Sequence, residues 1–212
     1  MKIQQAGLFL RNLLKPYYHV LLRILHHPIF VWNHIPVRRS WQKKGKLEIG
    51  SGSIRRSGWI SSDYRPGCDL MLDITRKWPF KDGTLQELYC CHVLEHFSHV
   101  QLKYILKEAN RVLAPGGRFR ISVPDLDIFL KAYANNSTEI MKFEPAKISK
   151  CSSDILNYIF YMDGEHKNMF DFENMTYHLS NAGFIRIDRR PYDEDLDGTG
   201  RDDESLFVVC YK

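Results

Sequence analysis

Acidic residues are absent from the first 47 positions, although nine of the chain's 30 lysines and arginines lie there. The other 21 basic residues stand against all 25 acidic ones, so residues 48–212 carry a formal charge of −4, whereas the whole chain carries +5. Nucleic-acid-binding domains are usually basic, so this distribution argues against a nucleic-acid partner. It indicates a separate basic leader, which we assign to residues 1–45.

The leader also lacks a continuous apolar stretch of about 20 residues, the length that a membrane-spanning helix needs. No signal peptide is predicted, because no small-residue cleavage site follows a clean apolar segment. Apolar residues at helical spacing between Pro16 and Pro28 instead predict an amphipathic helix. Such a helix can lie on an anionic membrane or pack on the domain as a cap, and the pattern does not separate the two. We expect a cytoplasmic protein, peripheral at the inner membrane surface in the first case.

The five cysteines are odd in number and show no Cys-x-x-Cys spacing, which argues against a zinc knuckle or a disulfide framework. Cys90 and Cys91 lie in an apolar run and are expected in the core of a protein from a reducing compartment. A hydrophobic content of 44% excludes disordered and collagen-like chains. The sequence therefore predicts a globular domain behind the leader.

Short runs with the composition of β-strands recur along the chain. They cover residues 46–50, 58–63, 68–73, 85–91, 118–123, 184–190 and 206–211. Helical patterns separate several of them. The first helical pattern covers residues 102–113 and is ended by Pro115-Gly116-Gly117. The third helical pattern runs from Asp171, its N-cap, to Gly183. The second follows Asp125 as an N-cap, with an apolar stripe of Leu126, Phe129, Leu130 and Tyr133.

Alternation of strands and helices predicts an α/β fold, a Rossmann-like, seven-stranded, mostly parallel sheet that is covered on both faces. The last two strands are joined by a loop too short for a helical crossover, so they form an antiparallel terminal hairpin. Only about eight residues separate Gly52 from the second strand, and a helical crossover needs about a dozen. The first helix should therefore be stunted or absent.

The segment from Lys46 to Asp63 has the outline of a nucleotide-like cofactor pocket, because an acid and two glycines close one apolar run and an aspartate closes the next. Gly50 and Gly52 allow positive φ and close approach of the backbone to a ligand. Asp63 can accept both ribose hydroxyls. A nicotinamide dehydrogenase shares the Gly-x-Gly pattern, but its third glycine usually opens a full helix, and Arg55 stands here instead.

Several ordered motifs follow this loop at compatible spacing. They are Leu47-Glu48-Ile49-Gly50-Ser51-Gly52, Gly58-Trp59-Ile60 leading to Asp63, Asp69 to Asp73, Trp78-Pro79-Phe80, His92-Val93-Leu94-Glu95-His96-Phe97, Arg111-Val112-Leu113-Ala114-Pro115-Gly116-Gly117 and Ile121-Ser122-Val123-Pro124-Asp125. With these motifs, residues 46–135 resemble a class I S-adenosylmethionine-dependent methyltransferase of the subgroup often called type 11. The resemblance implies a methyltransferase domain over residues 46–212 with S-adenosylmethionine as its cofactor.

The resemblance also implies a role for each pocket residue. Glu48 would organise the methionine end of the cofactor, and Gly50 and Gly52 would permit contact along its backbone. Asp63 would take the ribose hydroxyls. Asp73 would contact the adenine amino group, and Ile74 would pack against the adenine ring. His92 would lie beside the methionine moiety.

Methyl transfer from a sulfonium is an in-line displacement that needs no covalent enzyme intermediate, so positioning supplies much of the rate. A general base helps when the acceptor is a hydroxyl. His96 is the candidate catalytic base, because imidazole titrates near neutral pH. The alternative is a helix histidine bonded to a neighbouring carbonyl.

Two metal patterns compete with this interpretation, and we assign no metal ligand from the sequence. His92, Glu95 and His96 can share a helix face and suit a divalent metal if another ligand such as His166 approaches. They resemble the motif of metal-dependent small-RNA 2′-O-methyltransferases, which has glutamate in place of His92. Residues 193–204 satisfy the EF-hand loop pattern, but strand-like flanks favour an acidic, solvated loop over a calcium site.

The resemblance thus implies a methyltransferase that acts on a small-molecule or sugar/glycan hydroxyl, of the kind found in polysaccharide biosynthesis. An insert over about residues 137–170 would cover the acceptor. Two alternatives remain open: a non-catalytic module that keeps the fold, and a metal-assisted O-methyltransferase that uses His92, Glu95 and His96.

Overall fold

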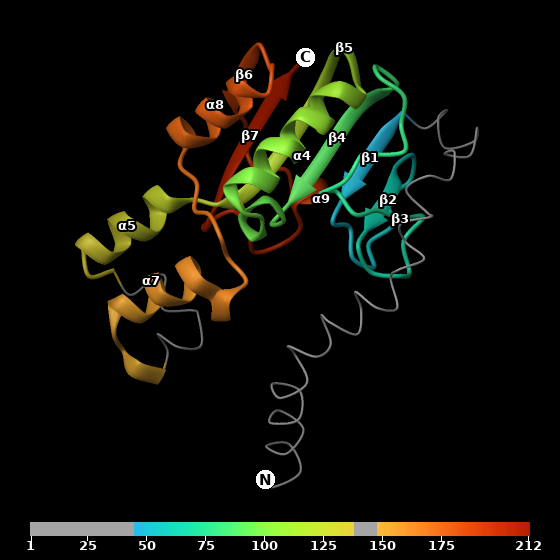
Figure 1. Ribbon diagram of the computed structural model, residues 1–212. Coiled ribbons are helices and arrows are strands. Elements are labelled where there is room, and N and C mark those ends of the chain that lie inside the picture. Colours follow the sequence, from blue (N-terminus) through green and yellow to red (C-terminus); the bar gives the residue numbers. More distant parts are fainter. Residues whose placement is uncertain (1–44, 138–147) are drawn as a thin grey trace, which may run out of the picture.

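The computed structural model describes residues 45–137 and 148–212, so almost all of the predicted leader lies outside the described residues. The described chain forms one seven-stranded sheet of order β3-β2-β1-β4-β5-β7-β6 (Figure 1). Strands β1 to β5 pair in parallel, while β7 runs antiparallel to both β5 and β6. The predicted mostly parallel sheet with an antiparallel terminal hairpin is confirmed.

The strands fall within or close to the runs that the sequence predicts. Their bounds are Lys46–Ile49 (β1), Ile60–Asp63 (β2), Leu70–Met71 (β3), Leu85–Cys91 (β4), Leu113–Pro124 (β5), Arg186–Arg189 (β6) and Ser205–Tyr211 (β7). Residues 50–59 join β1 to β2 without a helix, as the short crossover predicts. Within the described ranges, no helix is both long enough and apolar enough to cross a membrane.

The helices follow the strands in the order typical of an α/β fold. Their bounds are Leu94–His96 (η1), His99–Val112 (α4), Leu126–Ala134 (α5), Ser152–Tyr161 (α7), Met162–Gly164 (η2), Phe172–Asn181 (α8) and Glu194–Asp197 (α9). The predicted caps are present, since Asp125 accepts from the N–H of Asp127 and Asp171 accepts from that of Asn174. The first predicted helix ends at Val112 rather than at the Pro-Gly-Gly sequence, which lies inside β5.

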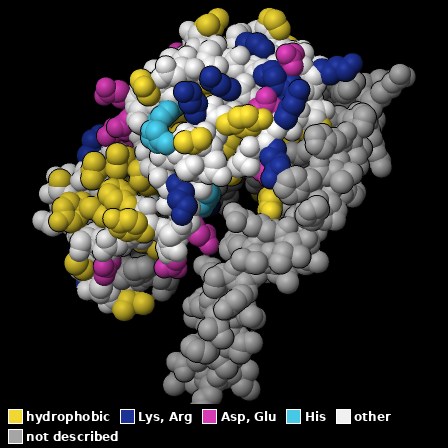
Figure 2. Space-filling model, in the orientation of Figure 1, with side chains coloured by type: hydrophobic (Ala, Val, Ile, Leu, Met, Phe, Trp, Pro, Cys, Tyr) yellow, Lys and Arg dark blue, Asp and Glu magenta, His cyan; other side chains and the backbone are white. Residues whose placement is uncertain are grey.

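Helices α5 and α7 form a lobe beyond the end of β5 (Figure 1). Its small core contains Phe129 and Ala132 of α5 with Ile155 and Ile159 of α7. The predicted apolar stripe of α5 is therefore only partly correct. Leu130 and Tyr133 are 44% and 46% exposed, because α7 covers a different face of the helix. Figure 2 shows hydrophobic side chains gathered over this lobe.

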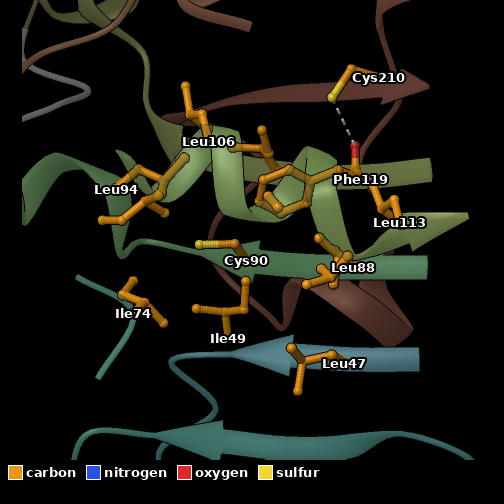
Figure 3. Close-up of a cluster of buried hydrophobic side chains, with 14 of the residues drawn as sticks. Leu47, Ile49, Ile74, Leu88, Cys90, Leu94, Leu106, Leu113, Phe119 and Cys210 are labelled. Atoms are coloured by element: carbon orange, nitrogen blue, oxygen red, sulfur yellow. Dashed lines mark hydrogen bonds between the residues drawn. The ribbon is translucent and has the colours of Figure 1, made fainter. Parts of the chain in front are cut away.

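The main core lies between the sheet and helices α4 and α8. Alternate residues of the central strands, such as Leu47, Ile49, Leu88 and Cys90, point into it (Figure 3). Cys210 of β7 donates its thiol to the carbonyl of Phe119 on β5, at 3.7 Å. Helices α4 and α8 therefore pack on this face of the sheet through apolar contacts.

The opposite face of the sheet differs from the prediction that helices cover both faces. The described residues place only the short helix α9 and the 50–59 loop there, around Trp59, Tyr89 and Leu196. Cys91 lies on this face and is only partly buried, unlike its neighbour Cys90. The reason is the missing first helix, since the crossover after β1 is too short to supply a covering layer.

A buried carboxylate joins three strands on this same face. Glu87 of β4 lies 3.1 Å from Lys46 Nζ of β1, and 2.9 and 2.6 Å from the guanidinium groups of Arg118 and Arg120 of β5. Burial alone would raise the pKa of Glu87, but the hydrogen bond from Arg118 and the neighbouring positive charges outweigh it, so the pKa is lowered. The folded protein therefore favours the charged carboxylate.

Substituting Glu87→Gln should lower the free energy of unfolding at pH 7 by about 2 kcal/mol, the usual contribution of a hydrogen bond to a charged group. A lowered carboxyl pKa stabilises the fold above the unfolded-state pKa of about 4.5, and the stabilisation is lost as pH falls through the folded-state value. The difference from the wild type should therefore shrink in acid. Urea unfolding at pH 7 and pH 3.5 measures it. The exposed Arg186–Asp188 pair supplies the control, Asp188→Asn, with an expected loss below about 1 kcal/mol.

Candidate active site

The glycine loop leaves β1 at the carboxyl edge of the sheet. Gly50 and Gly52 have φ values of +70° and +54°, which confirms the backbone geometry expected of them. The N–H of Ser51 donates to the carbonyl of Ser62, and the N–H of Gly52 donates to Oδ2 of Asp63, both at 2.9 Å. The end of β2 therefore holds the loop in place.

Asp63 faces this loop and keeps capacity for a ligand. Its Oδ1 accepts from the N–H of Arg65 at 2.8 Å, and its Oδ2 accepts from Gly52. Each carboxylate oxygen has a second lone pair, so both can accept one more hydroxyl. A Cβ built at Gly52 would meet nothing within 4 Å, so the side of the loop that it faces is open. These features fit a ribose diol beside the loop.

Glu48 lies on β1 and is only 3% exposed. Burial raises its pKa, although the guanidinium of Arg56, whose Nε lies 3.2 Å from the carboxylate, opposes the shift. Arg56 also donates to the carbonyls of Asp195 and Leu196 in α9. Arg56 belongs to no recognisable sequence motif. One of its partners is on β1, before the 50–59 loop, and the others lie in the distant helix α9. Glu48 is thus placed beneath the loop and already holds one cation.

The predicted adenine-binding pair follows β3. Oδ1 of Asp73 accepts from the N–H and hydroxyl of Thr75, and Oδ2 lies 3.0 Å from Nε of Arg76. Ile74 is 7% exposed and belongs to the main core (Figure 3). Asp73 therefore shapes the turn that follows β3.

His92 follows β4 with φ at +51°, a left-handed conformation that is rare for residues other than glycine. Arg201 Nη1 lies 3.3 Å from its Nδ1, and Ser205 Oγ lies 2.8 Å from its Nε2. A guanidinium only donates, so Nδ1 is the acceptor and Nε2 carries the proton. Burial, with the charge of Arg201, lowers the His92 pKa to about 3. This ring is therefore a neutral, fixed element of the site, and neither Arg201 nor Ser205 carries a sequence motif.

Glu95, His96 and His166 come together beside it, with one ligand atom from each within 4.8 Å of the others. Two backbone hydrogen bonds join their segments, because the N–H groups of Lys167 and Asn168 donate to the carbonyl of Glu95. His92, Glu95 and His96 do not share one helix face as predicted, although Nδ1 of His92 and Nε2 of His96 lie 3.6 and 3.8 Å from Oε1 of Glu95. His92 precedes η1, and its Nδ1 is taken by Arg201.

The acidic 193–204 loop is solvated at Glu194, Asp195, Asp202 and Asp203, as its composition predicts, but two of its acids are buried. Asp197 is 4% exposed and pairs with Arg190 at 2.6 Å, while Tyr89 donates to the same carboxylate. Glu204 is also buried and pairs with Arg201 at 2.7 Å. These two acids hold the loop on the face of the sheet that carries α9, where Arg190 and Arg201 compensate their burial.

Comparisons with known proteins agree with this geometry. Residues 47–121 match the family model described as a methyltransferase domain. A crystal structure of an S-adenosylmethionine-dependent methyltransferase from Archaeoglobus fulgidus aligns over 91% of this chain and 93% of its own, with 14% identity and a TM-score of 0.51. No curated protein matches the sequence.

Two further structures align with lower scores. A possible histamine N-methyltransferase from Thermotoga maritima shares 16% identity over 92% of this chain and 99% of its own, with a TM-score of 0.49. A carbon methyltransferase, CurJ, shares 15% identity over 78% of this chain with a TM-score of 0.47. The alignment covers 47% of the CurJ chain, so this chain spans about half the length of that protein.

The strand order and the glycine loop define a class I methyltransferase fold. Residues 47–121 also match the methyltransferase-domain model, and together these findings support an S-adenosylmethionine-dependent methyltransferase.

Substituting Asp63→Asn should weaken binding of S-adenosylhomocysteine about 10- to 100-fold, because a charged acceptor of two hydroxyls is replaced by a neutral group with one acceptor atom. Titration calorimetry measures the change. Asp188→Asn, in an exposed pair on β6, is the matched control and should bind as the wild type does. Equal affinities of the wild type, Asp63→Asn and Asp188→Asn would show that Asp63 does not bind the cofactor.

Proposed function

We propose that the enzyme transfers a methyl group from S-adenosylmethionine to a hydroxyl of a small molecule or of a sugar in a glycan. The observation that supports a hydroxyl acceptor is an imidazole at the cofactor edge. His96 has a 34% exposed side chain, and its Nδ1 lies 3.2 Å from the carbonyl of Glu165. A carbonyl only accepts, so Nδ1 carries the proton and Nε2 has the free lone pair that a base needs.

The residues of the glycine loop and β2 would hold the donor. S-adenosylmethionine supplies a methyl group on a positively charged sulfur. Asp63 fixes the ribose, and the left-handed backbone at Gly50 and Gly52 brings N–H and C=O groups close to the ligand. His96 takes the proton that the acceptor hydroxyl loses, and the acceptor oxygen gains the methyl group in its place.

The α5–α7 lobe would cover the acceptor. It stands beyond the carboxyl end of β5, the sheet edge at which ligands bind in open α/β folds (Figure 1). His166, which follows the lobe, contacts His96 with ring centroids 5.0 Å apart. An amphipathic acceptor such as a lipid-linked sugar would suit the exposed apolar side chains of the lobe, including Leu130 and Tyr133.

His96→Gln should lower the rate of methyl transfer by roughly 10²- to 10⁴-fold, the usual contribution of a general base. Formation of S-adenosylhomocysteine in the presence of extracted glycan and metabolite pools measures that rate. Affinity for S-adenosylhomocysteine should not change. His99→Gln, three residues further on and outside the cluster, is the control. An unchanged rate in His96→Gln would refute the base.

The basic leader would keep a cytoplasmic enzyme at the inner membrane surface, close to a lipid-linked acceptor. Removal of residues 1–40, which hold six of the lysines and arginines and no acidic residue, should therefore abolish binding to vesicles with anionic lipid. Cosedimentation measures the binding, and neutral vesicles are the control. Equal binding of the full and shortened chains would refute a membrane role.

A further inference from the structure

Glu95 is a buried carboxylate without a hydrogen-bond donor. It is 1% exposed, and no described residue donates to either of its carboxylate oxygens. Its nearest basic groups are imidazole nitrogens, His92 Nδ1 at 3.6 Å and His96 Nε2 at 3.8 Å. Burial raises its pKa to about 8, although its own backbone N–H and the charge of Arg201 oppose the shift. Buried acids are normally paired in direct contact, and the nearest basic groups here are neutral imidazoles rather than a bound cation.

The two neighbouring histidines direct lone pairs to the same place. Nδ1 of His166 lies 2.5 Å from the carbonyl of Ile159, and Nδ1 of His96 lies 3.2 Å from that of Glu165. Each Nδ1 must therefore carry the proton, which leaves each neutral ring with a bare Nε2. A backbone carbonyl that fixes the far nitrogen in this way is the usual outer contact of a metal-binding histidine.

We propose that Glu95, His96 and His166 bind a divalent first-row transition-metal ion. The three ligand atoms lie within 4.8 Å of one another. Bonds of about 2.1 Å bring such atoms to roughly 3.4 Å apart in a tetrahedral site, so closure needs movements of about 1 Å. Two imidazoles and one carboxylate suit Zn²⁺, Co²⁺ or Mn²⁺ better than Mg²⁺ or Ca²⁺, which prefer oxygen ligands.

Three protein ligands leave a coordination position open, which is the arrangement of catalytic rather than structural sites. His96 is partly exposed, so that position can be reached from solvent. In the second half of the proposal, which rests on the proposed function, the ion lowers the pKa of the acceptor hydroxyl. The hydroxyl proton then leaves to water, the oxygen bonds to the methyl carbon, and the carbon–sulfur bond breaks with its electron pair on sulfur. Nε2 of His96 then acts as a ligand instead of a base.

The test is metal binding by the full chain after treatment with a chelator. Co²⁺ should give visible absorption bands of a nitrogen- and oxygen-ligated site, and Zn²⁺ should bind in calorimetry. Glu95→Gln and His166→Gln should each weaken this binding at least about 10-fold, because loss of even an outer-shell partner costs that much. Four histidines precede residue 45, so comparison of variants, rather than stoichiometry, locates the site.

His99→Gln is the matched control, because His99 lies outside the cluster and makes an edge-to-face contact with His178. It should bind Co²⁺ and Zn²⁺ as the wild type does. Glu95→Gln replaces a buried acid by a neutral group of the same shape and should leave the melting temperature nearly unchanged, which separates loss of a ligand from loss of the fold. Identical Co²⁺ spectra and Zn²⁺ affinities in the wild type, Glu95→Gln and His166→Gln would overturn the site.

Turnover separates the metal site from the proposed function. If the ion activates the acceptor, chelation should reduce methyl transfer at least about 10-fold, and added Zn²⁺, Co²⁺ or Mn²⁺ should restore it. Binding that depends on Glu95 and His166, with transfer insensitive to chelation, would overturn the catalytic half and leave His96 as a base. Metal binding itself is measured without an acceptor, so it stands even if the acceptor is not a hydroxyl.

Discussion

The parallel register of three strands is the constraint on which the site depends. Ile49, the last residue of β1, pairs with Ser62 of β2 on one side and with Cys90 of β4 on the other. The segments that follow these strands therefore meet at one edge of the sheet. The fit is tight, because a Cβ at Gly50 would lie 2.3 Å from Cγ2 of Val93. Glycine is required there both by its left-handed backbone and by the close approach of the segment after β4.

A second constraint joins that edge to a distant part of the chain. The carbonyl of Glu95 receives two N–H groups from residues 167 and 168, so η1 and the segment before α8 are held as one unit. This places His166 beside His96, although 70 residues of sequence, including the whole of β5 and the α5–α7 lobe, separate them. Helical periodicity around His96 points to His92 instead, but His92 precedes η1 with a left-handed backbone, and its Nδ1 contacts Arg201.

The sequence predicts what depends on local patterns. Strand positions, the caps at Asp125 and Asp171, and the missing first helix all follow from residue spacing and loop length. It fails where a partner from elsewhere decides the outcome. The burial of Asp197 depends on Arg190 and Tyr89, and the exposed side of α5 depends on where α7 packs. Neither contact leaves a signature in the segment concerned, so composition alone assigns the wrong environment.

The buried carboxylates Glu87, Glu108 and Glu95 of the described residues differ in what compensates their burial. Glu87 is held by Arg118 and Arg120, and Glu108 of α4 is held by Arg111 at 2.7 Å. Although burial opposes it, the pKa of each carboxyl is lowered. Such pairs have a structural role. Glu95 is buried as deeply, but its nearest basic groups are the imidazoles of His92 and His96, and burial raises its pKa despite the opposing charge of Arg201. Keeping an uncompensated acid in the interior costs stability, and structural packing would be better served by an apolar residue. A group that is destabilising until something binds is the expected property of a binding site, and it lies where the strands of this fold converge.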